Sequence, residues 1–321
     1  MKRSTFLAGA AVGSSLAATS ARSVAFAEDY PSRPITLIVP WGPGGGSDQV
    51  GRAVAKAMEP IVKVSIPVIN VPGADGNNGI VKLVTGDADG YTMAVFITDT
   101  FVGNMTAKET APWKLSDIVP LAMMNAQPFA YWVARNSPYH TWEEFQKAAK
   151  TQQMRVAGTG FGSGEELATK FIARKSGTKL TFVPFAKPGE RYAAVLGNQV
   201  DIMCDPDGNV RSYAQSGQMR ALSVLENHRV PQLGSNVPTA TELGYPVVLR
   251  EWRTIAVKAG TDPAKIKFLS NALRDTYKSA DFQEFIKSSW SEPDSYMPGD
   301  KVLAFWDEQR KFITKLMAAS Q

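Results

Sequence analysis

The sequence predicts an α/β protein of two domains, on three observations. The chain has 321 residues, which at roughly 100–200 residues per domain corresponds to two domains. Short β-branched runs alternate with amphipathic segments, an order typical of a parallel sheet covered by helices. A glycine-rich loop follows a predicted strand twice, at residues 41–46 and 158–164. The unit of strand, glycine loop and helix therefore occurs once in each predicted domain.

The first unit begins at the β-branched run 35–39, which is closed by Pro40 and predicts a buried strand. The loop 41–46 cannot form regular structure, and Ser47 or Asp48 is a suitable N-cap for the helix that follows. Further strands are predicted over 68–71 and 91–97, with a short helix over 80–84. This βαβαβ order indicates the parallel sheet of a first domain.

The apolar stretch 119–133 is broken by Asn125, Gln127 and Pro128. Pro128 argues against a regular helix or central strand through the middle of the stretch. We interpret the stretch as a strand that leaves the first domain and enters the second. The predicted organisation is a signal peptide at 1–27, domain 1 at 28–126 plus 224–321, and domain 2 at 127–223.

The alternation of strands and helices then restarts in the predicted second domain. Helices are predicted over 142–150, 165–174 and 191–196, and strands over 155–157, 180–183 and 200–204. Residues 221–225 are interpreted as the strand that returns to the first domain. Three C-terminal helices, over 263–277, 281–288 and 301–318, are expected to pack on the first domain.

The N-terminus has the three parts of a secretory signal peptide. Lys2 and Arg3 precede an apolar or small run over 6–18, and Ala25-Phe26-Ala27 supplies small residues at the expected cleavage site. The alternative is a buried N-terminal helix. A membrane-spanning helix is not expected, because the apolar run is too short to span a bilayer of roughly 30 Å. We expect cleavage after Ala27 and a mature protein in the periplasm.

Composition argues against several classes of function. Residues 1–27 hold three basic and no acidic residues, so the mature chain has 32 basic against 30 acidic residues and lacks the charge of a nucleic-acid binder. The single cysteine, Cys204, excludes an internal disulfide and lies in an apolar pattern typical of a buried thiol. The two histidines, His140 and His228, lie in polar stretches and are expected at the surface.

Enzyme motifs fail on spacing. Gly42-Pro43-Gly44 would begin a dinucleotide fingerprint, but its third glycine position is Ser47. Ser163 does not lie in the G-x-S-x-G spacing of a nucleophile elbow. No catalytic or cofactor motif is therefore recognised, and one cysteine and two histidines leave little material for a bound metal.

The two glycine loops instead predict a site for an anion. A helix start leaves backbone N–H groups without internal partners and carries about half a positive charge from the helix dipole. Glycine lets a ligand approach that backbone closely. Either loop alone is equally explained as a tight turn. Two such loops, one in each domain, predict a cleft that closes on a small anion from both sides.

At this point the sequence resembles the extracytoplasmic solute receptors of tripartite tricarboxylate transporters, over nearly the whole mature chain. The shared landmarks occur in order: Tyr30–Ile35, Pro40–Asp48, Asn70–Gly79, Asp89–Thr92, Gly160–Ser163, Val183–Phe185, Gly197–Asp201 and Val237–Thr239 with Glu242 and Gly244. The chain departs from the usual pattern at Trp41, where phenylalanine is common, and at Glu166, where a histidine is often found. It also departs at Asp99 and at 251–253.

The resemblance implies a two-domain periplasmic-binding-protein fold, type II-like, whose ligand cleft lies between the domains. It implies a monomeric receptor that closes around a mono-, di-, tri- or aromatic carboxylate. It implies no catalysis, no catalytic residues and no cofactor. The partner would be a membrane transporter with a large and a small integral subunit. In the family, the loops that match 41–48 and 158–163 hold the carboxylate, largely through backbone groups.

The candidate ligand-binding residues lie in these loops and beside them. Ser47, Thr98 and Ser163 can donate hydroxyl hydrogen bonds, although Ser47 and Ser163 can equally cap helices. Arg253 can pair with a second carboxylate, and the alternative is an ion pair with Glu251 or another acid. The full set is Trp41, Gly42, Gly45, Ser47, Asp48, Thr98, Asp99, Gly160, Phe161, Gly162, Ser163, Phe185, Asp205 and Arg253.

Three functions remain open from the sequence. The first is a transport receptor for a small organic carboxylate. The second is a periplasmic sensor that reports its ligand to a membrane kinase, and the residues do not separate it from the first. The third is an exported α/β hydrolase, which lacks a nucleophile and base in a recognisable arrangement.

Overall fold

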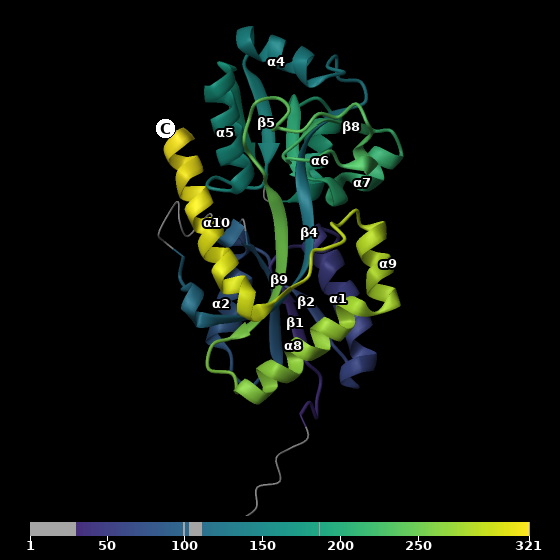
Figure 1. The fold of residues 1–321 in the computed structure, drawn as a ribbon, viewed down its shortest axis with the longest axis vertical. Helices are drawn as coiled ribbons and strands as arrows, with labels where there is room; N and C mark the ends of the chain where they lie inside the picture. Colours follow the sequence, from purple (N-terminus) through teal and green to yellow (C-terminus); the bar gives the residue numbers. More distant parts are fainter. Residues whose placement is uncertain (1–29, 99, 103–110, 186, 321) are drawn as a thin grey trace, which may run out of the picture.

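The computed structural model describes residues 30–98, 100–102, 111–185 and 187–320. These residues form two lobes stacked along the long axis of the molecule, each a sheet flanked by helices (Figure 1). The α/β class predicted from the sequence is confirmed. The predicted signal peptide and Asp99 lie outside the described residues.

The first lobe is built on three parallel strands, which carry helices on both faces (Figure 1). Side chains alternate along the strands, so Leu37 and Val39 pack under α1, α8 and α9, while Ile38 packs on the side of α2. The elements are β1 (Thr36–Val39), α1 (Gly46–Val62), β2 (Val68–Asn70), η1 (Ala74–Gly76), α2 (Asn77–Thr85), β3 (Thr92–Ile97), η2 (Leu115–Asp117), α8 (Pro263–Lys278) and α9 (Ala280–Ser288).

The second lobe repeats this plan with β5 parallel to β6 and to β7. Its elements are α4 (Trp142–Thr151), β5 (Met154–Gly158), α5 (Gly164–Ser176), β6 (Leu180–Pro184), α6 (Pro188–Leu196), β7 (Ile202–Pro206), α7 (Asp207–Gln215), β8 (Met219–Val224) and η3 (Pro231–Leu233). Helix α7 was not anticipated from the sequence, because few apolar residues mark it. Cys204 is buried in β7 as expected.

Two antiparallel strands, β4 (Ile118–Ala134) and β9 (Arg250–Lys258), connect the lobes. The interpretation of 119–133 as a strand that passes from the first lobe to the second is confirmed. The expectation that Pro128 argues against a central strand is wrong, because β4 is continuous over 17 residues. Pro128 lies where β4 changes neighbours, from β9 to β7 and β8. Pro128 has no N–H to donate, but it lies where the pairing changes, so its presence interrupts few hydrogen bonds between the strands.

The strand that returns to the first lobe is β9, and the assignment of this role to 221–225 is wrong. Most of that segment belongs to β8, which pairs with β4 inside the second lobe. The sequence did not reveal β9 because Glu251 and Arg253 interrupt its apolar pattern. Its position between β3 and β4 makes it central to the sheet.

The C-terminal helix α10 (Gly299–Ser320) does not pack on the first lobe alone, as was expected. It follows the short strand β10 (Met297–Pro298), which pairs with β4, and runs along the side of the molecule to α5 (Figure 1). Its buried residues Val302, Trp306 and Ile313 belong to one apolar cluster with residues of both lobes. Within the described residues, none of the helices combines the length and apolar character needed to cross a membrane.

Candidate functional site

The two glycine loops have the same backbone course. Each follows a parallel strand, passes through one left-handed glycine and enters a helix two residues later. Gly44 has φ 83° and Gly162 has φ 87°, and the residues that follow are the N-caps of α1 and α5. Because this conformation is rarely open to other residues, glycine is required at both positions. The repeat noted coarsely in the sequence therefore extends to individual residues.

A carboxylate fixes each loop from inside its own helix. Asp48 Oδ2 accepts a hydrogen bond of 3.0 Å from the Gly44 N–H, and Glu166 Oε2 accepts one of 2.5 Å from the Gly162 N–H. Ser163 caps α5 by accepting a bond from the Glu166 N–H. The expectation that Ser47 or Asp48 is the N-cap of α1 is wrong, because α1 begins earlier and Gly45 occupies that position.

Asp48 is the most heavily bonded of the loop residues. Besides the Gly44 N–H, it accepts from Arg52 Nε at 2.9 Å and from Asn70 Nδ2 at 2.9 Å. Burial alone would raise the pKa of Asp48, but the hydrogen bonds from Arg52, Gly44 and Asn70 outweigh burial and lower it below the ordinary value. The ionised carboxylate thus holds the first loop in shape.

Asp48→Asn is expected to destabilise the protein at neutral pH, and the deficit should shrink as the solution becomes acidic. A carboxylate whose pKa is lower in the folded than in the unfolded state stabilises above the ordinary range of about 4 and loses that contribution as pH falls through the folded value. Urea unfolding at neutral and acidic pH measures this. The exposed Asp281→Asn serves as control, and an equal deficit at both pH values would contradict the prediction.

Both loops face the opposite lobe. A Cβ placed on Gly45 would lie 3.7 Å from Pro188 at the start of α6, and one on Gly46 would overlap Asn209 Oδ1 of α7. In the second loop, a Cβ on Gly160 would lie 3.0 Å from Asp75 Oδ1 of η1. The two lobes therefore contact each other at both loops, next to the starts of α1 and α5.

Aromatic residues lie in both loops and near them. Trp41 packs against Phe101, with ring centroids 5.3 Å apart. The Thr98 hydroxyl is buried and accepts a bond of 3.0 Å from Trp306 Nε1 of α10. Phe161, at the tip of the second loop, is 53% exposed, whereas Phe185 packs on the core of the second lobe. Trp41 and Phe161 are thus the aromatic rings placed at the loops themselves.

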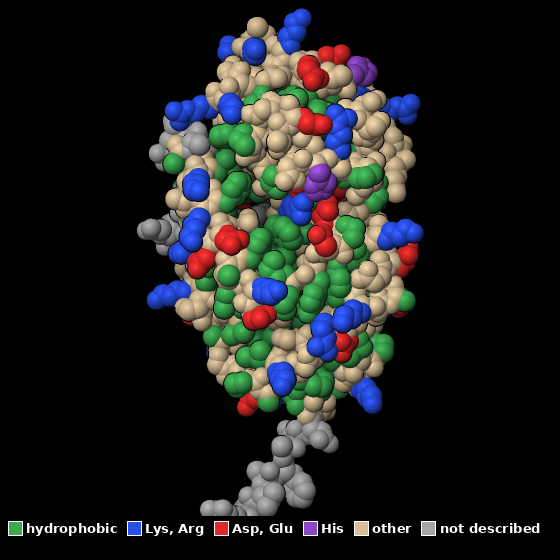
Figure 2. Space-filling view, viewed as in Figure 1, with side chains coloured by type: hydrophobic (Ala, Val, Ile, Leu, Met, Phe, Trp, Pro, Cys, Tyr) green, Lys and Arg blue, Asp and Glu red, His purple; other side chains and the backbone are tan. Residues whose placement is uncertain are grey.

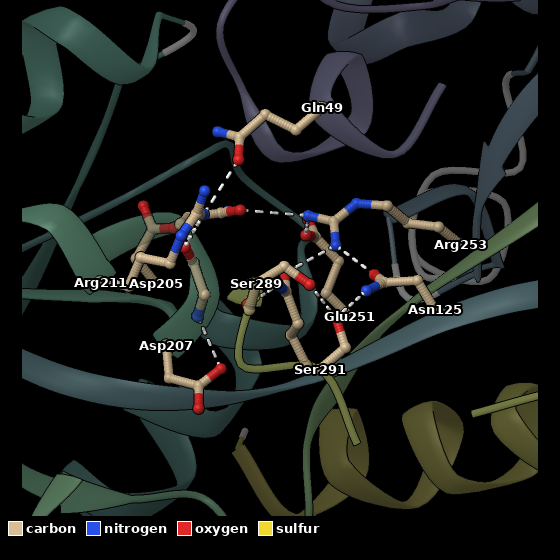
Figure 3. A network of polar contacts seen from close by, with 12 residues as sticks. Gln49, Asn125, Asp205, Asp207, Arg211, Glu251, Arg253, Ser289 and Ser291 are labelled. Carbon is tan, nitrogen blue, oxygen red and sulfur yellow. Dashed lines mark hydrogen bonds and ion pairs between the residues drawn. The ribbon is translucent and has the colours of Figure 1, made fainter. Parts of the chain in front are cut away.

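A buried polar block lies where the crossing strands pass between the lobes (Figure 3). Asn125 and Gln127 of β4 lie opposite Arg253 and Glu251 of β9 in the ladder. Arg253 Nη1 donates to Asn125 Oδ1 at 2.6 Å and to Gln127 Oε1 at 2.8 Å, while Nη2 forms an ion pair with Glu251. Of the two roles left open for Arg253, the structure shows the ion pair with Glu251.

This block also binds the second lobe. Arg253 Nη2 donates to Asn209 Oδ1 at 3.3 Å. Asn209 in turn donates to Asp205 Oδ1 at 3.1 Å, and Asp205 accepts from Arg191 Nε at 2.7 Å. Asp205 and Arg191 are almost completely buried. Asp205 therefore links Arg191 of α6 to Asn209 of α7, and its carboxylate is bonded to protein groups.

Sequence reasoning missed Asn125, Gln127 and Asn209 as members of this arrangement. The signal for the first two was present, since polar residues two apart in an apolar strand share one face. Glu251 and Arg253 show the same spacing on β9. Asn209 gave no such signal, because only the fold brings α7 to the crossing strands.

A separate cavity of about 610 Å³ lies beside α9, lined by residues that include His228, Ile286, Trp290 and Glu292. None of the glycine-loop residues lines this cavity. On the face drawn in Figure 2, Lys and Arg side chains are dispersed over both lobes among Asp and Glu. That distribution agrees with the nearly balanced numbers of basic and acidic residues in the sequence.

The comparison with known families decides the identity of the fold. The model of the tripartite tricarboxylate transporter family receptor matches residues 50–317. The chain belongs to this family. The resemblance inferred from the sequence landmarks is thereby confirmed, and so is the periplasmic-binding-protein fold. Members of the family are periplasmic solute-binding receptors rather than enzymes.

Individual members of the family are similar over nearly their whole length. Protein BugT of Bordetella pertussis is 27% identical over 309 residues, covering 95% of this chain and 92% of BugT. A TctC solute-binding protein from Polaromonas is 30% identical with a TM-score of 0.68, covering 90% of this chain and 99% of that one. MatC of Rhodopseudomonas palustris, solved with bound malate, is 22% identical with a TM-score of 0.79, covering 91% and 100%.

Proposed function

We propose that this receptor captures a small organic carboxylate between its lobes and delivers it to a tripartite tricarboxylate-type transporter. The observation that supports the proposal is that each of the two matched glycine loops lies against the opposite lobe, the first against Pro188 and Asn209 and the second against Asp75. The family membership and the malate bound to MatC support a carboxylate as the ligand.

The chemistry of binding follows from the helix starts. The first N–H groups of α1 and α5 have no partners within their helices, and the two dipoles add positive potential at the same space. Asp48 and Glu166 are tied to their own loops and neutralised by Arg52 and Lys170. The loops can therefore hold a carboxylate without a charged side chain in contact with it.

The proposed contacts are those predicted from the sequence, with changes of role. Trp41, Gly42, Gly45, Ser47, Gly160, Phe161, Gly162 and Ser163 stay in the proposed ligand shell. Asp48, Asp205 and Arg253 become positioning residues, because each is already bonded to protein groups. The Thr98 hydroxyl accepts a hydrogen bond from Trp306, and Thr98 is kept at the edge of the proposed ligand shell. Phe185 lies in the second-lobe core, and Asp99 lies outside the described residues.

We also propose that the protein is exported, cleaved after Ala27 and monomeric, with a large and a small integral membrane subunit as its partners. Domain 1 would comprise 28–126 and the chain from β9 onward, and domain 2 would comprise the residues between them, because β8 and η3 pack in the second lobe. Copurification of the mature protein with membranes that contain both subunits, only when ligand is present, would support the delivery step.

A melting screen tests the binding step. Refolded, ligand-free protein is mixed with mono-, di-, tri- and aromatic carboxylates. A ligand at 100 times its dissociation constant should stabilise the fold by about 2.7 kcal/mol, which raises the melting temperature by several degrees. Sugars and amines serve as controls. Shifts with these controls and none with any carboxylate would contradict the proposal.

A further inference from the structure

The arginines at the boundary between the lobes differ in their partners. Three of them bind carboxylates, which offsets the cost of removing their charge from water. The pairs are Arg191 with Asp205, Arg250 with Glu226, and Arg253 with Glu251. The fourth, Arg211 of α7, has no carboxylate partner among the described residues.

Arg211 extends from the second lobe to the first (Figure 3). Its Nη1 donates to Gln49 Oε1 of α1 at 2.9 Å and to the Gly208 carbonyl at 2.8 Å. Gln49 Nε2 in turn donates to the Gly44 carbonyl at 3.1 Å. One side chain therefore separates the guanidinium from the first glycine loop. Within the described part of the chain, Nε and Nη2 of Arg211 make no hydrogen bond.

The environment of Arg211 disfavours its charge. Burial lowers the pKa of Arg211, and no acidic group acts to raise it. The acidic residues near Arg211 do not form an ion pair with it. Asp205 is held by Arg191, Glu251 is held by Arg253, and burial raises the pKa of Asp207 well above its ordinary value, which favours the neutral form. A half-buried cation is thus left without an anion beside the proposed ligand site.

We propose that Arg211 binds a second carboxylate of the ligand, so that this receptor takes a dicarboxylate held between the first glycine loop and α7. The inference rests on the proposed function and names its substrate class. The planar guanidinium matches a carboxylate with two parallel hydrogen bonds, and Nε with Nη2 supplies one such pair. The second carboxylate of the ligand would supply the negative charge that the protein does not place beside Arg211.

The test compares ligands that differ by one carboxylate. Refolded, ligand-free protein is titrated by calorimetry with the linear dicarboxylates from malonate to suberate, each beside the monocarboxylate of the same carbon number. The wild type should prefer a dicarboxylate. Arg211→Gln keeps hydrogen-bonding groups near Gln49 but removes the charge. It should weaken that dicarboxylate by about 10- to 100-fold and leave the matched monocarboxylate unchanged.

Two further variants separate charge from structure. Gln49→Ala removes the bond between the lobes but keeps the arginine, so any loss should be the same for both ligands. Arg211→Lys keeps a point charge without the planar fork and should recover part of the preference. Arg310→Gln, on the exposed face of α10, controls for net charge. Urea unfolding confirms that each variant is folded.

The outcomes distinguish this inference from the proposed function. Equal weakening of both ligands by Arg211→Gln, or a wild type that binds only monocarboxylates, would overturn the role of Arg211 and leave carboxylate capture intact. A wild type that binds no carboxylate would overturn both. A loss confined to dicarboxylates in Arg211→Gln would establish the inference.

Discussion

Replacing Gly46 with alanine is expected to hold the lobes apart and weaken ligand binding by about 10-fold or more, since overpacking costs about 1–3 kcal/mol. Gly46 is the first residue of α1, and a Cβ there would overlap Asn209 Oδ1 and Arg253 Nη2. Alanine is otherwise the better helix former. The first lobe should therefore stay folded, while α7 no longer reaches its closed position.

Small-angle scattering and calorimetry with the best ligand from the screen measure the two effects of Gly46→Ala. The radius of gyration should stay large at ligand concentrations that compact the wild type. Gly189→Ala is the matched control, because Gly189 lies in the first turn of α6 and a Cβ there would meet nothing within 4 Å. A variant at Gly46 that compacts and binds like the wild type would show that the close approach of α7 is not needed for closure.

Glu251→Gln is expected to destabilise the protein by about 3–5 kcal/mol, because removing one partner of a buried ion pair leaves the other charge uncompensated. Arg253 is 1% exposed and Glu251 is 7% exposed, so water cannot replace the lost carboxylate. Glutamine has nearly the same volume, which excludes a cavity as the cause. The neighbouring Asn125 and Gln127 offer Arg253 only neutral oxygens.

Urea and thermal unfolding measure the effect of Glu251→Gln, and the melting temperature should fall by roughly 10 °C. Asp307→Asn is the matched control, because it removes the partner of Arg310 from an exposed pair in α10 and should leave stability unchanged. If the two substitutions had equal effects, the Glu251–Arg253 pair would contribute no more than a surface contact.

Local patterns in the sequence determined much of this fold and of its candidate site. The β-branched run before Trp41 and the glycines of both loops predicted the strand–loop–helix units, because left-handed turns and helix starts depend on residues close in sequence. The same landmarks identified the family.

The tertiary structure alone decided which charges are paired. Arg253 and Arg211 look alike in the sequence, yet Arg253 meets Glu251 on its own strand while Arg211 crosses to Gln49 in the other lobe. Strand β9 and the course of α10 were also decided there, because both depend on contacts between segments far apart in the chain. A buried charge finds or lacks a partner according to residues that the fold brings to it from elsewhere in the chain, and a local sequence pattern does not contain that information.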